Sequence, residues 1–170
     1  MTKGRLIPIF PKPIGRVPFG VNYARSLLSF DVDVRDFFEH VDIHSVYLWD
    51  LMVRAIWKIL HSGFRSPCCF GSIIEGATIA GGIAEVTTDR CIRIDSQRLR
   101  QYEDSVAMAL VAHELAHDHL RHFKTWKNNL DYEHEADNLA KAWGFNINLF
   151  RKTFGPPVIN SRLLQIAVIH

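Results

Sequence analysis

The stretch that decides the fold is VAHELAHDHLRHF, residues 111–123. It contains an HExxH motif, formed by His113, Glu114 and His117, and its upstream flank is apolar, so the pattern predicts a helix over about residues 102–123. Residues four apart on a helix point to the same side, so both imidazoles can bind one metal ion. Glu114 then lies at the rim of that face, where its carboxylate can reach a water molecule without binding the metal.

A second stretch, EHEAD at residues 133–137, follows the motif and predicts a helix over about residues 129–143. Glu133 and Asp137 are four apart, so this helix presents both on one face, with small residues beside them. We therefore expect Glu133 to be the third metal ligand and Asp137 to orient a ligand imidazole from behind. Glu135 falls on another face and is interpreted as solvated.

The alternative interpretation is that the histidines merely occupy a helix surface. The apolar flank of the motif argues against it, because polar groups without partners are costly in such surroundings. His119 and His122 lie off the i, i+4 face of the motif, and we expect both to face solvent.

The motif HELAH followed by ExEADxxAxxxG resembles the gluzincin metallopeptidases, in particular soluble peptidase domains of the Ste24/HtpX type and the short minigluzincins. The resemblance covers about residues 83–144. It implies that the two motif histidines and the first Glu of ExxxD bind zinc, that the motif Glu is the general base, and that the Asp supports a ligand. By position these residues are His113, His117, Glu133, Glu114 and Asp137.

The expected fold class is α+β: a zincin-like small mixed β-sheet with a buried backing helix, an HExxH active-site helix and a following glutamate helix. The backing helix is predicted over about residues 43–61, where a narrow polar stripe of Asp50, Arg54 and Lys58 crosses an otherwise apolar pattern. Residues 64–95 are punctuated by glycines and predict about three short strands. Their spacing matches no phosphate-binding loop.

The run of residues 90–95 alternates polar with apolar side chains, as a half-buried strand does. The resemblance implies an edge strand just before the motif helix, and this run is expected to be that strand. A protein or peptide substrate would then lie extended along it by strand addition.

Residues 1–25 are interpreted as an irregular, basic, Pro- and Gly-rich arm, and residues 26–170 as a single zincin-like metallopeptidase domain. No acidic residue precedes Asp31, so the arm has a second interpretation as a segment that binds an acidic partner. The net charge of +2 is too small to indicate a nucleic-acid partner. The apolar tail over residues 163–169 is expected to complete the core, or alternatively to occupy the cleft.

No secretory signal or membrane-spanning stretch is recognisable, so a cytoplasmic location is expected. The three cysteines do not form the framework of a secreted disulfide protein. The absence of a span also separates the chain from Ste24 and HtpX, whose membrane-protein substrates are not expected here.

The predicted function is that of a zinc-dependent endopeptidase with one Zn2+ per chain, in which Glu114 takes a proton from a zinc-activated water. One alternative is an ImmA/IrrE-like regulatory metalloprotein that cuts or binds a dedicated protein partner. Another is a non-catalytic scaffold with a structural zinc. No oxyanion-stabilising residue stands out, and the candidates near the motif in sequence are Arg121, Tyr132, His134 and Arg151.

Overall fold

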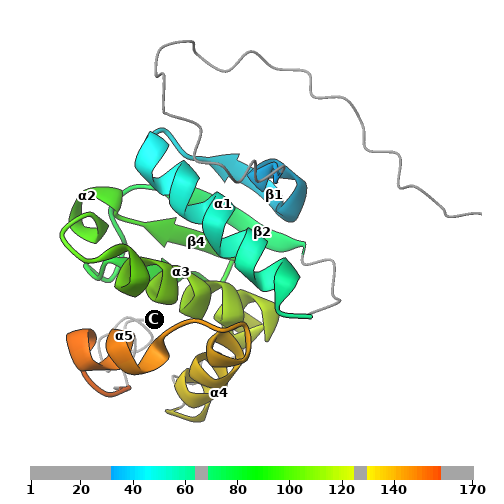
Figure 1. The fold of residues 1–170 in the computed structure, drawn as a ribbon. Helices are drawn as coiled ribbons and strands as arrows, with labels where there is room; N and C mark the ends of the chain where they lie inside the picture. Colours follow the sequence, from blue (N-terminus) through cyan, green and yellow to red (C-terminus); the bar gives the residue numbers. More distant parts are fainter. Residues whose placement is uncertain (1–31, 64–68, 125–129, 158–170) are drawn as a thin grey trace, which may run out of the picture.

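The computed structural model describes residues 32–63, 69–124 and 130–157. Within them the chain forms a four-stranded mixed sheet with strand order β1-β2-β4-β3 (Figure 1). The strands are β1 (Phe38–Asp42), β2 (Phe70–Glu75), β3 (Ala84–Val86) and β4 (Cys91–Ile94). β1, β2 and β4 run parallel, and β3 pairs with β4 in the antiparallel direction. The predicted α+β class is confirmed.

The helices follow the apolar periodicity of the sequence. They are α1 (Val46–His61), α2 (Ser96–Leu99), α3 (Asp104–His119), α4 (Leu130–Ala142) and α5 (Ile147–Phe154), with short 3-10 turns at Val34–Phe37 and His122–Lys124. The predicted helices over residues 43–61, 102–123 and 129–143 are therefore present as α1, α3 and α4, each of which lies within its predicted range. α5 was not predicted.

α1 is the crossover that connects the parallel strands β1 and β2. Ser45 caps its first turn by accepting a hydrogen bond from the Leu48 backbone N–H at 3.2 Å. Gly63, with φ 82°, follows the helix in the left-handed conformation that glycine adopts without strain. α1 and α3 pack against each other over the sheet, and α4 and α5 cover the opposite side of α3 (Figure 1).

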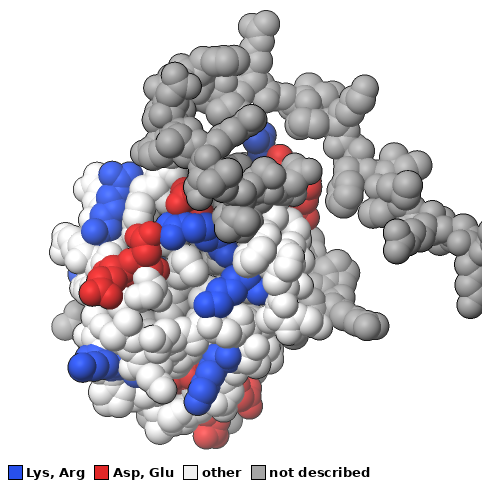
Figure 2. Space-filling model, viewed as in Figure 1, with Lys and Arg blue, Asp and Glu red and all other residues white. Residues whose placement is uncertain are grey.

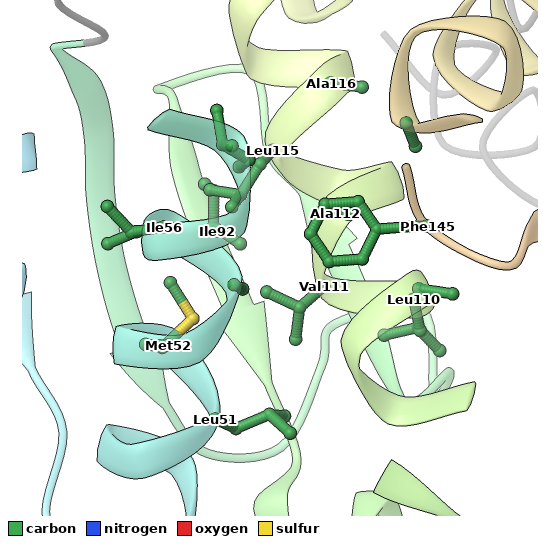
Figure 3. Packing of buried hydrophobic residues seen from close by; sticks show 14 of the residues in the cluster. Leu51, Met52, Ile56, Ile92, Leu110, Val111, Ala112, Leu115, Ala116 and Phe145 are labelled. Atoms are coloured by element: carbon green, nitrogen blue, oxygen red, sulfur yellow. The ribbon is translucent and has the colours of Figure 1, made fainter. Parts of the chain in front are cut away.

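The core lies between α1, α3 and the sheet. Met52 and Ile56 of α1, Leu115 of α3 and Ile92 of β4 are each at most 1% exposed, and Figure 3 shows them in one cluster. Burying one such side chain contributes about 1.5–3 kcal/mol. α3 is therefore fixed by its apolar face, and its other side is left to carry the HExxH residues.

The prediction that residues 90–95 form an edge strand is wrong. The strand exists as β4 but lies between β2 and β3, and β3 is the edge on that side of the sheet. Three of its four residues are buried, as an interior strand requires. β3 spans only Ala84–Val86 and follows a glycine-rich turn, so its short apolar pattern gave no strand signal.

The arm over residues 1–25 and the tail over residues 163–169 lie outside the described residues. No helix in the described ranges has the length and apolar character that crossing a membrane requires. On the face seen in Figure 2, Lys and Arg side chains of the described residues are scattered over neutral surface, not gathered in one patch.

Candidate metal centre

The centre begins with two histidines one turn apart on α3. Nε2 of His113 lies 3.0 Å from Nε2 of His117, and the two rings stand nearly perpendicular, at 88°. The residue His113 is only 4% exposed. The structure therefore points both Nε2 atoms at one place on the side of α3 that faces away from the core.

α4 brings Glu133 to the same place. Its Oε2 lies 3.3 Å from Nε2 of His113, and its Oε1 lies 3.3 Å from Nε2 of His117. Among the described residues, these three form the one group of His, Cys, Asp or Glu side chains whose ligand atoms converge, all within 4.8 Å of one another. The three ligands predicted from sequence thus meet, although they come from two helices.

These distances fit a metal ion. Zinc bonds of about 2.0–2.2 Å to nitrogen and oxygen give a tetrahedron with edges of about 3.3–3.6 Å. The N–N separation of 3.0 Å is close to such an edge, and so are the two N–O separations of 3.3 Å, which end on different oxygens of Glu133. The two imidazole nitrogens and the carboxylate directed at one point also attract a cation, which a metal ion can supply. The donor set of two imidazoles and one carboxylate suits divalent transition metals, zinc among them.

Asp137 stands behind His113. Its Oδ1 lies 2.9 Å from Nδ1 of His113, the ring nitrogen that faces away from the three converging donors. The pair is an electrostatic contact and not a well-directed hydrogen bond, because Nδ1 has no partner of good hydrogen-bond geometry among the residues that the structure describes. Burial opposes a charge on His113, but Asp137 and Glu133 outweigh it and raise the pKa of His113 to about 9.

Arg151 of α5 holds both acids of α4. Its Nε donates to Oδ2 of Asp137 at 2.7 Å, and its Nη2 donates to Oδ1 of Asp137 at 2.8 Å and to Oε2 of Glu133 at 3.1 Å. Burial opposes the ionisation of Asp137, but contacts with His113 and Arg151 hold its pKa below the ordinary value. The pKa of Glu133 is likewise lowered against burial, chiefly by the two histidines.

From the sequence, Arg151 was only one of several candidates for oxyanion stabilisation, and its position beside Glu133 and Asp137 was not predicted. The reason is that helix α5, which carries Arg151, was itself not predicted. Asn146 caps it by accepting a hydrogen bond from the Leu149 backbone N–H at 3.1 Å. Phe150 is buried with its ring centroid 5.3 Å from that of His113, which places the next residue against the centre.

Glu114 follows the first ligand and is partly buried. Burial raises the pKa of its carboxyl to about 7, with Glu133 and Glu85 of β3 adding to the shift and His113 and Arg151 opposing it. A carboxyl that titrates near neutral pH can both accept and return a proton under physiological conditions.

His122 departs from the prediction that it faces solvent. Its side chain is 8% exposed, its Nδ1 lies 2.9 Å from Nδ1 of His117, and its Nε2 lies 3.0 Å from Oε2 of Glu135. The reason is the sharp turn after α3, where Arg121 adopts φ 60° and returns the chain toward the centre. Burial lowers the pKa of His122. His119 is also partly buried, with its ring 6.2 Å from that of Trp143.

The chain was compared with protein-family models, with curated proteins and with solved structures. No family model matches it, no curated protein matches it, and no solved structure matches it. The geometry and the chemistry of this centre are therefore what indicates the function of the chain.

Proposed function

We propose that this chain is a zinc-dependent peptidase of the gluzincin type, with zinc held by His113, His117 and Glu133 and with Glu114 as the general base. The observation that carries the proposal is the convergence of two imidazoles of α3 and the Glu133 carboxylate of α4, with N–N and N–O separations of 3.0–3.3 Å, beside a carboxyl whose pKa is about 7. Three protein ligands leave one tetrahedral position for water or substrate, which is typical of catalytic sites.

When bound, zinc supplies Lewis-acid chemistry, acidifying water and polarising a carbonyl group. The residues of the chain do the rest. Glu114 takes a proton from the attacking water and returns it to the amine that leaves. Asp137 orients His113, and Arg151 keeps Asp137 and Glu133 in place with three hydrogen bonds.

The arrangement of elements supports the zincin-like interpretation. A small mixed sheet carries the buried helix α1 as a backing helix, α3 bears HExxH, and α4 follows with the glutamate. This is the set of elements that the resemblance in sequence implies.

The strand along which a substrate would lie is β3, in place of residues 90–95. β3 is the edge of the sheet, it packs against α3, and its Glu85 contributes to the raised pKa of Glu114, so it lies beside the general base. An extended peptide that adds to the open edge of β3 would pass next to the metal centre.

The test combines zinc content with the substitution Glu114→Gln. We expect about one zinc per purified chain, hydrolysis of a mixed peptide library by the wild type, and a loss of at least about 100-fold in kcat for Glu114→Gln with zinc retained. Glu103→Gln is the matched control, because Glu103 is an exposed glutamate at the start of the same helix and makes no side-chain capping bond. It should cleave like the wild type.

Full activity of Glu114→Gln would show that the base is assigned wrongly. A zinc-loaded wild type that cleaves nothing in the library, but binds one protein tightly, would favour the alternative of an ImmA/IrrE-like regulatory metalloprotein.

A further inference from the structure

The two ligand histidines have different partners behind them. Nδ1 of His113 faces the carboxylate of Asp137 directly, at 2.9 Å. Nδ1 of His117 faces another imidazole, that of His122, also at 2.9 Å. The far nitrogen of His122 in turn reaches Glu135 at 3.0 Å. His117 therefore also has a carboxylate behind it, that of Glu135, but His122 lies between the two.

The hydrogen positions along this chain of contacts follow from the metal centre. His117 can bind a metal through Nε2 only if its proton is on Nδ1. This Nδ1–H then donates to Nδ1 of His122, which must be unprotonated to accept. The proton of His122 is consequently on Nε2, from which it donates to Oε2 of Glu135. Each of the three groups has its matching donor or acceptor, and the lone pair of His117 Nε2 remains directed at the site.

We propose that His122 is a positioning residue of the metal centre, which fixes the tautomer and ring orientation of His117, and that Glu135 acts on His117 through His122. The inference rests on the metal centre of the proposed function. His122 and Glu135 are neither metal ligands nor the general base of the proposed function.

Packing supports this role. The ring of His122 stacks on that of Tyr132, with centroids 4.4 Å apart and an interplanar angle of 16°, so it has little freedom to rotate. The side chain of His122 is 8% exposed, whereas that of Glu135 is 56% exposed. A contact that water can replace contributes less, so the effect of Glu135 should be the smaller of the two.

The first experiment measures the dissociation constant of Zn2+ by competition with a chelator. Removing an outer partner of a ligand histidine typically weakens metal binding about 10–100-fold, and we expect this for His122→Ala. His122→Gln, whose amide oxygen can accept from Nδ1–H, should recover most of the affinity. Glu135→Ala should weaken binding only a few-fold (about 2–5-fold), and the double variant should be no weaker than His122→Ala alone, because Glu135 acts through His122.

His119→Ala is the matched control, since His119 is a partly buried histidine three residues away whose ring faces Trp143 and not the centre. It should bind zinc like the wild type. A second measurement needs no variant: nitrogen NMR of the zinc-loaded wild type should show His117 protonated on Nδ1, with a coupling across the hydrogen bond to Nδ1 of His122.

The outcomes separate the two proposals. A wild type that binds zinc and cleaves peptides, while His122→Ala keeps its full zinc affinity, would overturn the role of His122 and leave the proposed function intact. The absence of the N–N coupling in the loaded wild type would do the same. A wild type that binds no zinc would overturn both.

Discussion

Oδ1 of Asp137 lies 2.9 Å from the outer ring nitrogen of His113, while both oxygens of the same carboxylate accept hydrogen bonds from Arg151, at 2.7 and 2.8 Å. The carboxylate is thus held from α5 while it contacts a residue of α3. Asp137 of α4 thus contacts residues of both α3 and α5, and the position of His113 depends on the packing of all three helices.

We therefore expect Asp137→Asn to weaken zinc binding by about 10–100-fold without removing it, since all three ligands remain. The measurement is zinc competition against a chelator. Asp131→Asn, an exposed aspartate on the same helix α4, should leave the affinity unchanged. Equal affinity of Asp137→Asn and wild type would mean that Asp137 does not orient His113.

Arg151→Met should destabilise the metal-free protein by about 2 kcal/mol, because it takes the guanidinium away from the partly buried acids Glu133 and Asp137. With zinc bound, Glu133 regains a cation, so the loss should be smaller. Urea unfolding with and without zinc measures both values. Lys152→Met removes a neighbouring exposed charge and should change neither by more than about 0.5 kcal/mol.

A chelator should abolish activity and leave the chain folded. The core between α1, α3 and the sheet is built from apolar side chains and contains none of the ligands. Zinc at 100 times its dissociation constant adds about 2.7 kcal/mol of stability, so its removal should lower Tm while far-UV circular dichroism stays native at 25 °C. Unfolding on chelation would instead support the alternative of a structural zinc.

Arg90, which is partly buried, and Asp118, which is buried, form an ion pair that ties the end of α3 to the sheet. The guanidinium donates to Asp118 at 3.1 and 3.0 Å, and Asp118, with a side chain 1% exposed, also accepts from the Gly71 backbone N–H at 3.0 Å. Arg90→Met leaves this carboxylate without its cation and should cost about 3 kcal/mol of unfolding free energy.

A second ion pair of Arg90, with Glu39, is the control for its pair with Asp118. Glu39 contacts Nη1 of Arg90 at 2.6 Å, but its side chain is 51% exposed. Glu39→Gln should therefore cost no more than about 1 kcal/mol in urea unfolding. Similar losses for both variants would show that burial of Asp118 is not what makes the pair matter.

Glu75 at the end of β2 should give stability a pH dependence. It accepts hydrogen bonds from the backbone N–H groups of His44 at 2.7 Å and Ser45 at 2.6 Å, and from the hydroxyl of Ser96. Burial opposes the charge, but these bonds hold the pKa of Glu75 below its ordinary value of 4.5. Its contribution is then fully present above pH 4.5 and is lost as the pH falls through the lowered pKa.

Accordingly, Glu75→Gln should be less stable than the wild type at pH 7, and the difference should shrink as the pH falls below 4.5. Urea unfolding at several pH values measures it. A difference that does not change with pH would mean that the charge of Glu75 contributes nothing.

The three long helices could be predicted from the sequence because they depend on local periodicity. The apolar patterns of α1, α3 and α4 repeat with the helical period, and His113, His117 and Glu133 lie at spacings that place them on the right faces. β1 and α5 were not predicted, because a strand of five residues and a helix of eight are too short for a periodic signal.

What the sequence determined by itself is therefore the set of donors and the faces from which they project. Only the tertiary structure decided which strand is the edge, since strand order depends on hydrogen bonds between segments far apart in the chain. It also decided that Arg151 and His122 lie behind the ligands, because spacing within one helix says nothing about which distant helix or turn packs against it. The periodicity of a helix determines the direction in which each side chain projects, and the packing between helices determines which side chains of other elements lie next to it.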